Sequence, residues 1–398
     1  MDSFFARRTS WNLATNRYTQ AIEAHRRAGR AVFDLTASNP TVVGLRFDDG
    51  KLLAALGNPQ ALRYDPQPKG LLSAREAVSA YYAEHGTSIL PDELILTTST
   101  SEAYSFVFRL LCDPGDAVIV PTPSYPLFEF LADIQDVTLF PYELVYDHGW
   151  QLDPESVFTA AQRAEASGAR CRAILTVHPN NPTGSFVDGR ERQLFNDLCA
   201  QYDCAIVADE VFLDYALTPP QAPTLAANED ALTFTLSGLS KISALPQMKV
   251  AWIAVSGLPS LRRDALERLE VIADTYLSMN APVQLAVPAM LDERKNIQPQ
   301  VLDRVRTNLA ELDGQLSTQS LCQRLEMAGG WYAILRVPAV RSDEDWAIIL
   351  LQDNDVLVQP GHFYDFASDG YLVISLITPA EEFAEGVRRL LAFIAAIR

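Results

Sequence analysis

Four short polar segments of this 398-residue chain contain residue types that can do chemistry. A lysine amine at Lys241 can act as a nucleophile or move a proton, a carboxylate at Asp209 can hold a positive charge, and an amide at Asn181 can hydrogen-bond a ligand. The fourth segment, residues 99–101, reads Ser-Thr-Ser, and its hydroxyls could receive an anion. The sequence therefore predicts one site in which an amine, a carboxylate, an amide and hydroxyls act together.

Each of these segments alone has an ordinary structural explanation. Lys241 could be a solvated lysine in a turn, Asp209 could cap the next helix, and Asn-Asn-Pro-Thr-Gly at residues 180–184 could be a plain turn. Together they follow one another at intervals of 28 and 32 residues, each just past an apolar run. No packing requirement explains that arrangement, so we interpret it as a functional site.

The elements that must position these residues are strands of an open α/β sheet. Apolar runs rich in β-branched residues alternate with amphipathic stretches between residues 70 and 255, and continuous apolar runs indicate strands buried on both faces. Ligands of such sheets bind at the carboxyl ends of the strands, where the polar segments lie. The six expected strands are 93–99, 117–122, 171–178, 204–211, 232–236 and 249–255.

The pattern changes after a long charged helix expected at 258–276. A helical region at 283–312, short strands and a terminal helix from residue 379 indicate a second α+β part, and the first 40 residues are expected to pack with it. The sequence predicts a large ligand-binding domain at 45–285 and a small domain made of 1–44 and 286–398.

Several motifs together resemble one known family. They are H-P-N-N-P-T-G at 178–184, A-D-E-V-F at 208–212, S-G-L-S-K at 237–241, Y-D-P-Q-P-K-G-L-L-S-A-R-E-A at 64–77 and C-D-P-G-D-A-V-I-V-P-T-P-S-Y at 112–125. The chain resembles the class I and II pyridoxal-phosphate aminotransferases of fold type I. The resemblance implies a mixed, mostly parallel seven-stranded sheet between helices plus a smaller α+β domain. It also implies amino-group transfer between an amino acid and a 2-oxo acid.

The resemblance assigns roles around the ring of pyridoxal 5′-phosphate. Lys241 would hold the cofactor as a Schiff base and then act as the catalytic acid and base. Asp209 would pair with the protonated ring nitrogen and keep the ring an electron sink. Asn181 would hydrogen-bond the ring hydroxyl, and Tyr125 would stack on the ring face.

Other roles concern the phosphate, the substrate and the partner subunit. Ser99, Thr100 and Ser101 would begin a helix whose N–H groups and hydroxyls receive the phosphate. Tyr64 would reach the phosphate of a neighbouring subunit, which implies a homodimer with shared active sites. Ser38 and Asn39 fall where the family contacts its substrate.

Three positions depart from the family pattern in the cofactor site. The usual phosphate-binding arginine is Lys249, which keeps the charge but loses the bidentate fork. The usual hydroxyl three residues before the lysine is Gly238. The usual tyrosine after the ring aspartate is Phe212, so the ring hydroxyl loses a hydrogen-bond donor, and we expect the bound cofactor to keep its proton to a higher pH.

The substrate side departs further, because Val373 stands where the family carries the arginine that binds the α-carboxylate. Arg7, Arg8, Arg46 and His362 are candidates to replace it, although a surface role is the ordinary one for each. Residues 276–279 also lack the arginine that aspartate-specific relatives use, so the sequence argues against a dicarboxylate substrate. A lyase, a decarboxylase or a cyclising enzyme on the same fold is therefore the alternative to an aminotransferase.

Composition bounds the remaining possibilities. A formal net charge of −18 disfavours binding to nucleic acid, and no apolar run is long enough to span a membrane. The five cysteines form no C-x-x-C pair, which is typical of a reducing compartment, so a cytoplasmic enzyme without a metal is expected. A non-catalytic ligand sensor on this fold is a further alternative, and the joint presence of Lys241, Asp209 and Asn181 argues against it.

Overall fold

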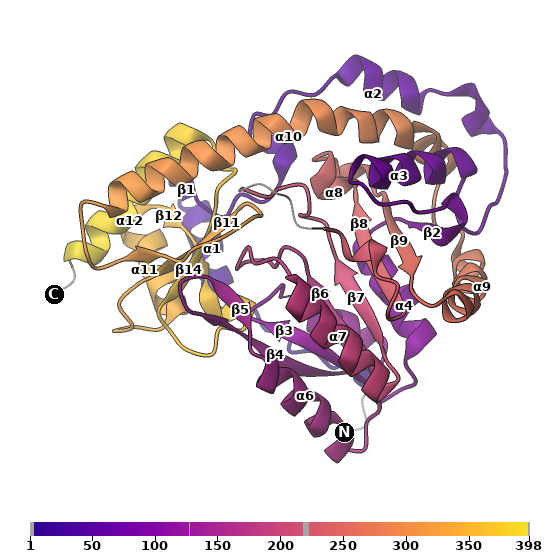
Figure 1. Ribbon diagram of the computed structural model, residues 1–398. Coiled ribbons are helices and arrows are strands. Elements are labelled where there is room, and N and C mark those ends of the chain that lie inside the picture. Colours follow the sequence, from indigo (N-terminus) through magenta and orange to yellow (C-terminus); the bar gives the residue numbers. More distant parts are fainter. Residues whose placement is uncertain (1–3, 127, 218–222, 397–398) are drawn as a thin grey trace.

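The computed structural model describes residues 4–126, 128–217 and 223–396, and Figure 1 shows a large sheet with its helices beside a smaller α+β part. The large sheet has the order β2-β9-β8-β7-β6-β3-β4-β5, in which β9 and β5 run antiparallel to their neighbours. Its strands are β2 (Leu94–Thr97), β3 (Ala117–Thr122), β4 (Thr138–Tyr146), β5 (Trp150–Leu152), β6 (Cys171–Val177), β7 (Ala205–Asp209), β8 (Thr233–Gly238) and β9 (Ala251–Ser256).

This mixed, mostly parallel sheet confirms the predicted fold class, but the strand count of seven was wrong. The sheet has eight strands because β5 pairs with β4 in a hairpin and extends one edge. The six strands expected from apolar runs are present, whereas β4 was missed because its exposed and buried residues alternate. A strand whose exposed and buried residues alternate carries no continuous apolar run.

Helices cover both faces of the large sheet, as buried parallel strands require. Local signals begin several of them. Ser99 caps α4 by accepting a hydrogen bond from the Glu102 N–H, and Asp188 with Glu191 forms a capping box at α7. The helices in or against this part are α2 (Asp49–Leu56), α3 (Leu72–Glu84), α4 (Thr100–Leu111), α5 (Phe128–Ile134), α6 (Pro154–Ala166), α7 (Gly189–Tyr202), α8 (Leu239–Ile242) and α9 (Pro259–Tyr276).

The smaller part contains a four-stranded sheet in the order β10-β11-β14-β13 and a parallel pair formed by β1 and β12. The pair joins the N-terminal segment to this part, and Trp331, Trp346 and Phe383 are fully buried in its core. Its elements are α1 (Arg17–Arg27), β1 (Phe33–Asp34), β10 (Gln323–Arg324), β11 (Tyr332–Arg336), α11 (Asp343–Asn354), β12 (Val356–Leu357), β13 (Gln359–Pro360), β14 (Tyr371–Ser375) and α12 (Ala380–Ala396).

One long helix, α10 (Ala281–Leu316), connects the two parts. It packs against α2 and α3 of the large part and against α12 of the smaller part, and Figure 1 shows it running across both. The predicted domain boundary at 285/286 falls inside this continuous helix, so the domain division stays a prediction. Among the described residues, no helix combines the length and the apolar character needed to cross a membrane.

Short connections complete the fold and bring the strand ends together. Because β2, β6, β7 and β8 run parallel to one another, their carboxyl ends lie at the same edge of the sheet. The single-turn 3-10 helices of the described chain are η1 (Arg7–Thr9), η2 (Pro40–Val42), η3 (Pro59–Leu62), η4 (Pro91–Glu93), η5 (Leu225–Ala227), η6 (Pro246–Met248) and η7 (Gly361–Tyr364).

Candidate active site

A cavity of about 330 Å³ lies at the carboxyl ends of the parallel strands. Most of the residues expected at the site line it together. They are Ser38, Ser99, Thr100, Ser101, Tyr125, Asn181, Asp209, Phe212, Lys241 and Lys249. The structure therefore brings into one cavity groups that lie up to 211 residues apart in the chain, between Ser38 and Lys249.

Two expected residues lie outside this cavity. Asn39 lines a more open groove that adjoins it and shares Ser38, Lys241 and Lys249 with it. Tyr64 is 82% exposed and lines a separate groove beside residues 277–280. Neither residue is placed against the cavity of its own chain.

Lys241 lies on the one-turn helix α8, directly after β8. Gly238, at the junction, lets β8 approach β9 closely, because a Cβ there would lie 2.8 Å from the Val250 carbonyl oxygen. The Lys241 Nζ is 4.9 Å from the centre of the Trp331 ring and 5.4 Å from that of the Phe212 ring. Burial lowers the pKa of Lys241 to about 8, although the charge of Asp209 opposes that shift. The amine is therefore partly neutral near physiological pH.

Asp209 is the last residue of β7, and its carboxyl group is held by two donors. The Val211 N–H donates to Oδ1 at 3.1 Å, and the Tyr104 hydroxyl donates to Oδ2 at 2.9 Å. Burial raises the pKa of Asp209 to about 6, while these donors and the charge of Lys241 pull the pKa in the opposite direction. The cavity thus contains a fixed carboxylate that a bound cation would stabilise further.

Asn181 carries a buried polar atom without a partner. Its Oδ1 has no hydrogen-bond partner within the described chain, whereas the neighbouring Asn180 side chain is bonded to Ser124, Pro123 and Thr183. Buried polar atoms are normally paired, so an unpaired carboxamide in a cavity indicates a place for a ligand. Tyr125 lies on the wall of the same cavity, and burial raises its pKa to about 12.

The remaining wall has the features of an anion site. Ser99 caps the N-terminus of α4, a twelve-residue helix, and Thr100 and Ser101 form its first turn. The first N–H groups of a helix have no intrahelical acceptor and point at whatever lies before them, which favours an anion. Lys249 adds a positive charge to the same cavity from the segment before β9.

The substrate side carries no guanidinium among the described residues that line the cavity. Val373 is fully buried in β14, where it pairs with Ile334 of β11 and Gln359 of β13. Arg8 forms an ion pair with Asp136 on the surface. Arg7, Arg46 and His362 are exposed and line neither this cavity nor the groove beside Asn39, so the structure supports none of these replacements.

Several residues of the site were not predicted from the sequence. Tyr332 lines the cavity, Trp331 lies beside Lys241, Tyr104 holds Asp209, and the Tyr215 hydroxyl donates to the Lys241 carbonyl at 2.6 Å. The Gly-Gly-Trp-Tyr segment at 329–332 marks the start of an expected strand and could have directed attention to the first two. Tyr104 and Tyr215 give no such signal, because both lie inside apolar stretches typical of a core.

Comparison of the sequence with known proteins assigns the chain to a family. The family model described as aminotransferase class I and II matches residues 12–390. An alanine aminotransferase of Mycobacterium tuberculosis is 25% identical over 394 residues, covering 93% of this chain and 87% of the relative. A glutamate-pyruvate aminotransferase of Haemophilus influenzae is 25% identical over 382 residues, covering 93% of this chain and 92% of the relative.

The fold agrees with solved structures. The alanine aminotransferase of Pyrococcus furiosus superposes with a TM-score of 0.87 at 20% sequence identity, covering 98% of this chain and 99% of that one. The chain belongs to the class I and II aminotransferase family. It is an aminotransferase of fold type I, as the motifs at the strand ends predicted.

Proposed function

We propose that this aminotransferase uses pyridoxal 5′-phosphate held covalently by Lys241. It transfers an amino group between an amino acid with a single carboxylate and a 2-oxo acid. The observation that carries the proposal is the meeting of Lys241, Asp209 and Asn181 in one cavity, where each offers a group that the cofactor needs. A buried amine, a fixed carboxylate and an unpaired carboxamide have no common structural purpose.

The residues present fit each part of the cofactor. The Ser99–Ser101 turn and Lys249 suit the phosphate, and Asp209 suits a protonated ring nitrogen. The free Oδ1 of Asn181 can accept a hydrogen bond from a ring hydroxyl. When bound, the cofactor supplies a reactive carbonyl and an electron-withdrawing ring, chemistry that no side chain provides.

Lys241 has the properties of the proton-transferring group. Its pKa of about 8 leaves part of the Nζ population neutral and able to take a proton from the substrate α-carbon, then return it to another carbon. Asp209 adds a negative charge to the same cavity, and this charge favours a proton on the ring nitrogen of the cofactor. The buried rings of Trp331, which lies beside Lys241, and Tyr332, which lines the cavity, reduce the access of water to Lys241.

We infer the substrate class from the charges of the cavity. Lys241 and Lys249 are the cations among the described residues that line it, and the cofactor would use both. The α-carboxylate of the substrate would find no guanidinium there, and a second carboxylate would add another unpaired negative charge, which favours a substrate with a single carboxylate. Alanine, which appears in the name of one relative, is the first donor to test, and glutamate, which appears in another, is the matched contrast.

A homodimer and a cytoplasmic location complete the proposal. Leu62 and Tyr64 are 94% and 82% exposed, and the exposed Leu277 lines the same groove as Tyr64, which suits the surface of a partner subunit. In the dimer Tyr64 would reach the partner's phosphate site. Sedimentation would show a dimer that dissociates when Tyr64 and Leu62 are replaced by charged residues.

All five cysteines are free thiols, which agrees with a reducing compartment and so with the proposed cytoplasmic location.

One experiment tests the covalent attachment. The purified protein with added pyridoxal 5′-phosphate is treated with borohydride, digested and mapped by mass spectrometry. We expect the reduced cofactor on Lys241 and a visible absorbance band that Lys241→Ala abolishes, while the surface variant Lys51→Ala keeps both. Label spread over several lysines, or turnover retained by Lys241→Ala, would contradict the proposal.

A second measurement separates transamination from the other reactions of this cofactor. The loaded enzyme is mixed with alanine or glutamate without an acceptor, and the 2-oxo acid, ammonia and carbon dioxide are measured. An aminotransferase forms one equivalent of 2-oxo acid per site and then stops until a 2-oxo acid acceptor is added. Continuous release of ammonia or carbon dioxide would instead identify a lyase or a decarboxylase.

A further inference from the structure

The helix that carries Lys241 depends on other parts of the chain for its position. α8 has four residues, and a helix of one turn is not stable by itself because it cannot offset the cost of its nucleus. The Tyr215 hydroxyl donates to the Lys241 carbonyl at 2.6 Å, and Gln298 Nε2 donates to the Ile242 carbonyl at 3.0 Å. The side chains of Tyr215 and Gln298, from two distant segments, therefore hold the backbone of α8, which carries Lys241.

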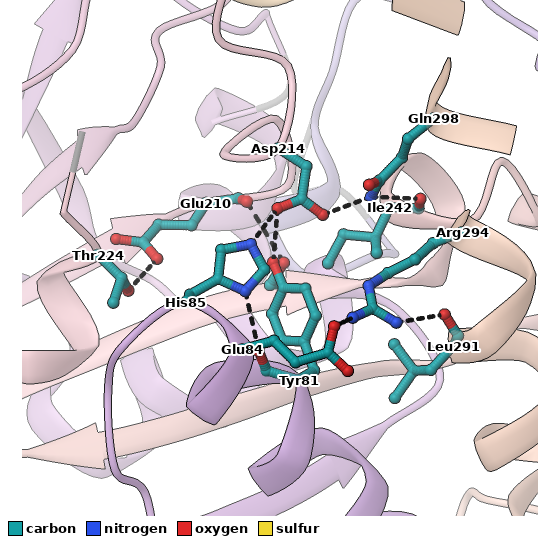
Figure 2. Close-up of polar contacts among 11 residues, drawn as sticks. Tyr81, Glu84, His85, Glu210, Asp214, Thr224, Ile242, Leu291, Arg294 and Gln298 are labelled. Atoms are coloured by element: carbon teal, nitrogen blue, oxygen red, sulfur yellow. Dashed lines mark hydrogen bonds and ion pairs between the residues drawn. The ribbon is translucent and has the colours of Figure 1, made fainter. Parts of the chain in front are cut away.

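Gln298, on the long helix α10, is oriented by a second acceptor. Its Nε2 also donates to Asp214 Oδ2 at 2.5 Å, and Figure 2 shows the carboxamide between Asp214 and Ile242. Both neighbours only accept hydrogen bonds, so the nitrogen of the carboxamide must face them. With the carboxamide reversed, its oxygen would face two other oxygens. Asp214 thus decides which way Gln298 points.

Asp214 is itself fixed by two donors on its other oxygen. The Tyr81 hydroxyl lies 3.2 Å and His85 Nε2 lies 2.6 Å from Oδ1, and the Asp214 side chain is 4% exposed. His85 Nδ1 faces the Tyr81 carbonyl at 2.8 Å, so both ring nitrogens face acceptors, an arrangement that favours the doubly protonated imidazolium. Both carboxylate oxygens accept charge-assisted or neutral hydrogen bonds, which an amide in the same place could not do.

We refer to Tyr81, His85, Asp214 and Gln298 as the Asp214 network. It connects α3, the segment after β7 and α10 to the carbonyl of Ile242, as Figure 2 shows. None of these four residues lines the cavity. The network therefore acts on the cavity indirectly, and its direct hydrogen bond to α8 is the one from Gln298 to the Ile242 carbonyl.

We propose that Asp214 and Gln298 are positioning residues for Lys241, an inference that rests on the proposed function of that lysine. The network fixes the Ile242 carbonyl and with it the direction in which the neighbouring Lys241 side chain leaves the backbone. A displacement of about 1 Å of a reacting group can cost about 100-fold in rate. Losing the network therefore slows the step at Lys241 while leaving substrate binding largely unchanged.

The chain offers a matched control for the test. Gln300 lies two residues further along α10, is half-buried like Gln298, and its Nε2 donates to the Arg46 carbonyl at 3.0 Å. With the cofactor-loaded enzyme, Gln298→Leu lowers kcat about tenfold or more with KM within about twofold, while Gln300→Leu leaves both within about twofold. Equal kcat values for the two variants, at similar melting temperatures, overturn the proposal.

A second variant and a spectroscopic readout cover a Gln298→Leu protein that does not fold. Asp214→Asn keeps the volume of the side chain but turns an N–H₂ group toward Gln298, so it lowers kcat in the same direction. The midpoint of the pH-dependent visible absorbance of the loaded enzyme, which reports the surroundings of the Lys241 nitrogen, shifts in Asp214→Asn and not in Gln300→Leu. An unchanged kcat and midpoint in Asp214→Asn overturn the inference.

The same series separates this inference from the proposed function. Turnover in Lys241→Ala contradicts the proposed function. If Lys241→Ala is inactive while Asp214→Asn and Gln298→Leu behave like Gln300→Leu, the proposed function holds and only the positioning role is refuted.

Discussion

The cavity around Lys241 and the Asp214 network both include residues of the segment that follows β7, and both contain buried polar groups. In the cavity, the Oδ1 of Asn181 has no partner, and burial raises the pKa of Asp209 to about 6. In the network, both oxygens of Asp214 and both ring nitrogens of His85 have partners. The cavity leaves the carboxamide oxygen of Asn181 available, whereas the network pairs its polar groups with one another.

This difference helps to distinguish a buried polar group that binds a ligand from one that holds the fold together. An unpaired buried polar atom costs stability, so one that belongs to a residue lining a cavity, as Asn181 does, is a candidate contact for a ligand. A fully paired network stabilises the fold and fixes geometry, and its removal leaves partners unsatisfied. Replacing an aspartate by asparagine should therefore raise the stability of the cofactor-free protein at Asp209 in the cavity and lower it at Asp214 in the network.

The largest effect is expected from Asp209→Asn in the cavity. We expect kcat/KM to fall about 100- to 1000-fold, because the variant loses the charge opposite the ring nitrogen. The cofactor-free variant should nevertheless unfold at a higher temperature than the wild type at pH 8, since a buried carboxylate with a raised pKa is costly when charged. Steady-state kinetics and circular dichroism melting measure the two quantities. Wild-type activity in this variant would remove Asp209 from the cofactor site.

The matched change in the network, Asp214→Asn, should lower stability. We expect the free energy of unfolding to fall by about 1–3 kcal/mol at pH 6, because Gln298 loses its acceptor and His85 loses the negative charge beside it. The exposed control Asp313→Asn, which loses an ion pair with Arg324, should change it by less than about 1 kcal/mol. Denaturant titration monitored by fluorescence gives both values, and equal losses would place Asp214 among ordinary surface carboxylates.

The cost of Asp214→Asn should also depend on pH through His85. Burial lowers the pKa of His85, but the hydrogen bond and charge of Asp214 and the Tyr81 carbonyl outweigh burial and the charge of Arg294, so the net shift is upward. A raised folded-state pKa contributes stability that is complete below the unfolded-state value near 6.5 and disappears as the pH rises through the folded-state value. The difference between wild type and variant should therefore shrink from pH 6 to pH 9.

A smaller effect is expected from Glu210, which follows Asp209 but faces the core. Its carboxyl accepts from the Thr224 hydroxyl and the Leu225 N–H, and burial raises its pKa to about 8. The folded protein then holds this proton more tightly than the unfolded chain, so Glu210 reduces stability as the pH rises from about 4.5 to about 8. Glu210→Gln should flatten the fall in melting temperature across that range. Parallel curves for the two proteins would show that the carboxyl group is not buried in this way.

The smallest effect is expected from Phe212→Tyr on the cavity wall. A phenol there adds one hydrogen-bond donor beside the bound ring, worth about 0.5–1.5 kcal/mol. The midpoint of the visible absorbance change of the loaded enzyme should then move down by about 0.4–1 pH unit. Phe212→Leu, which adds no donor, is the control, and a midpoint that moves equally in both variants would exclude the phenol as the cause.

The chain order of polar residues predicted which side chains meet in the cavity, because parallel strands end at one edge. Lys241, Asp209, Asn181 and the 99–101 turn each follow a continuous apolar run, and strands read from such runs were found. The alternating exposure of β4 and the shortness of β5 gave no such signal, so the apolar runs predicted six of the eight strands. The seven strands that the family resemblance implied are one fewer than observed. The reading of Asn39 and Tyr64 rested on family resemblance, and neither lies in the cavity of its own chain.

The sequence by itself determined the α/β fold class, the strand ends and the chemical groups placed there, because these depend on local patterns of burial and on residue type. Only the tertiary structure decided that Asp209 faces the cavity while Glu210 faces the core, and that Tyr104 and Tyr215 hold Asp209 and the Lys241 backbone. The pairing of Asp214 with His85 and Gln298 joins residues 129 and 84 positions apart. Such contacts depend on how helices pack across the sheet, and no local pattern in the chain records that packing.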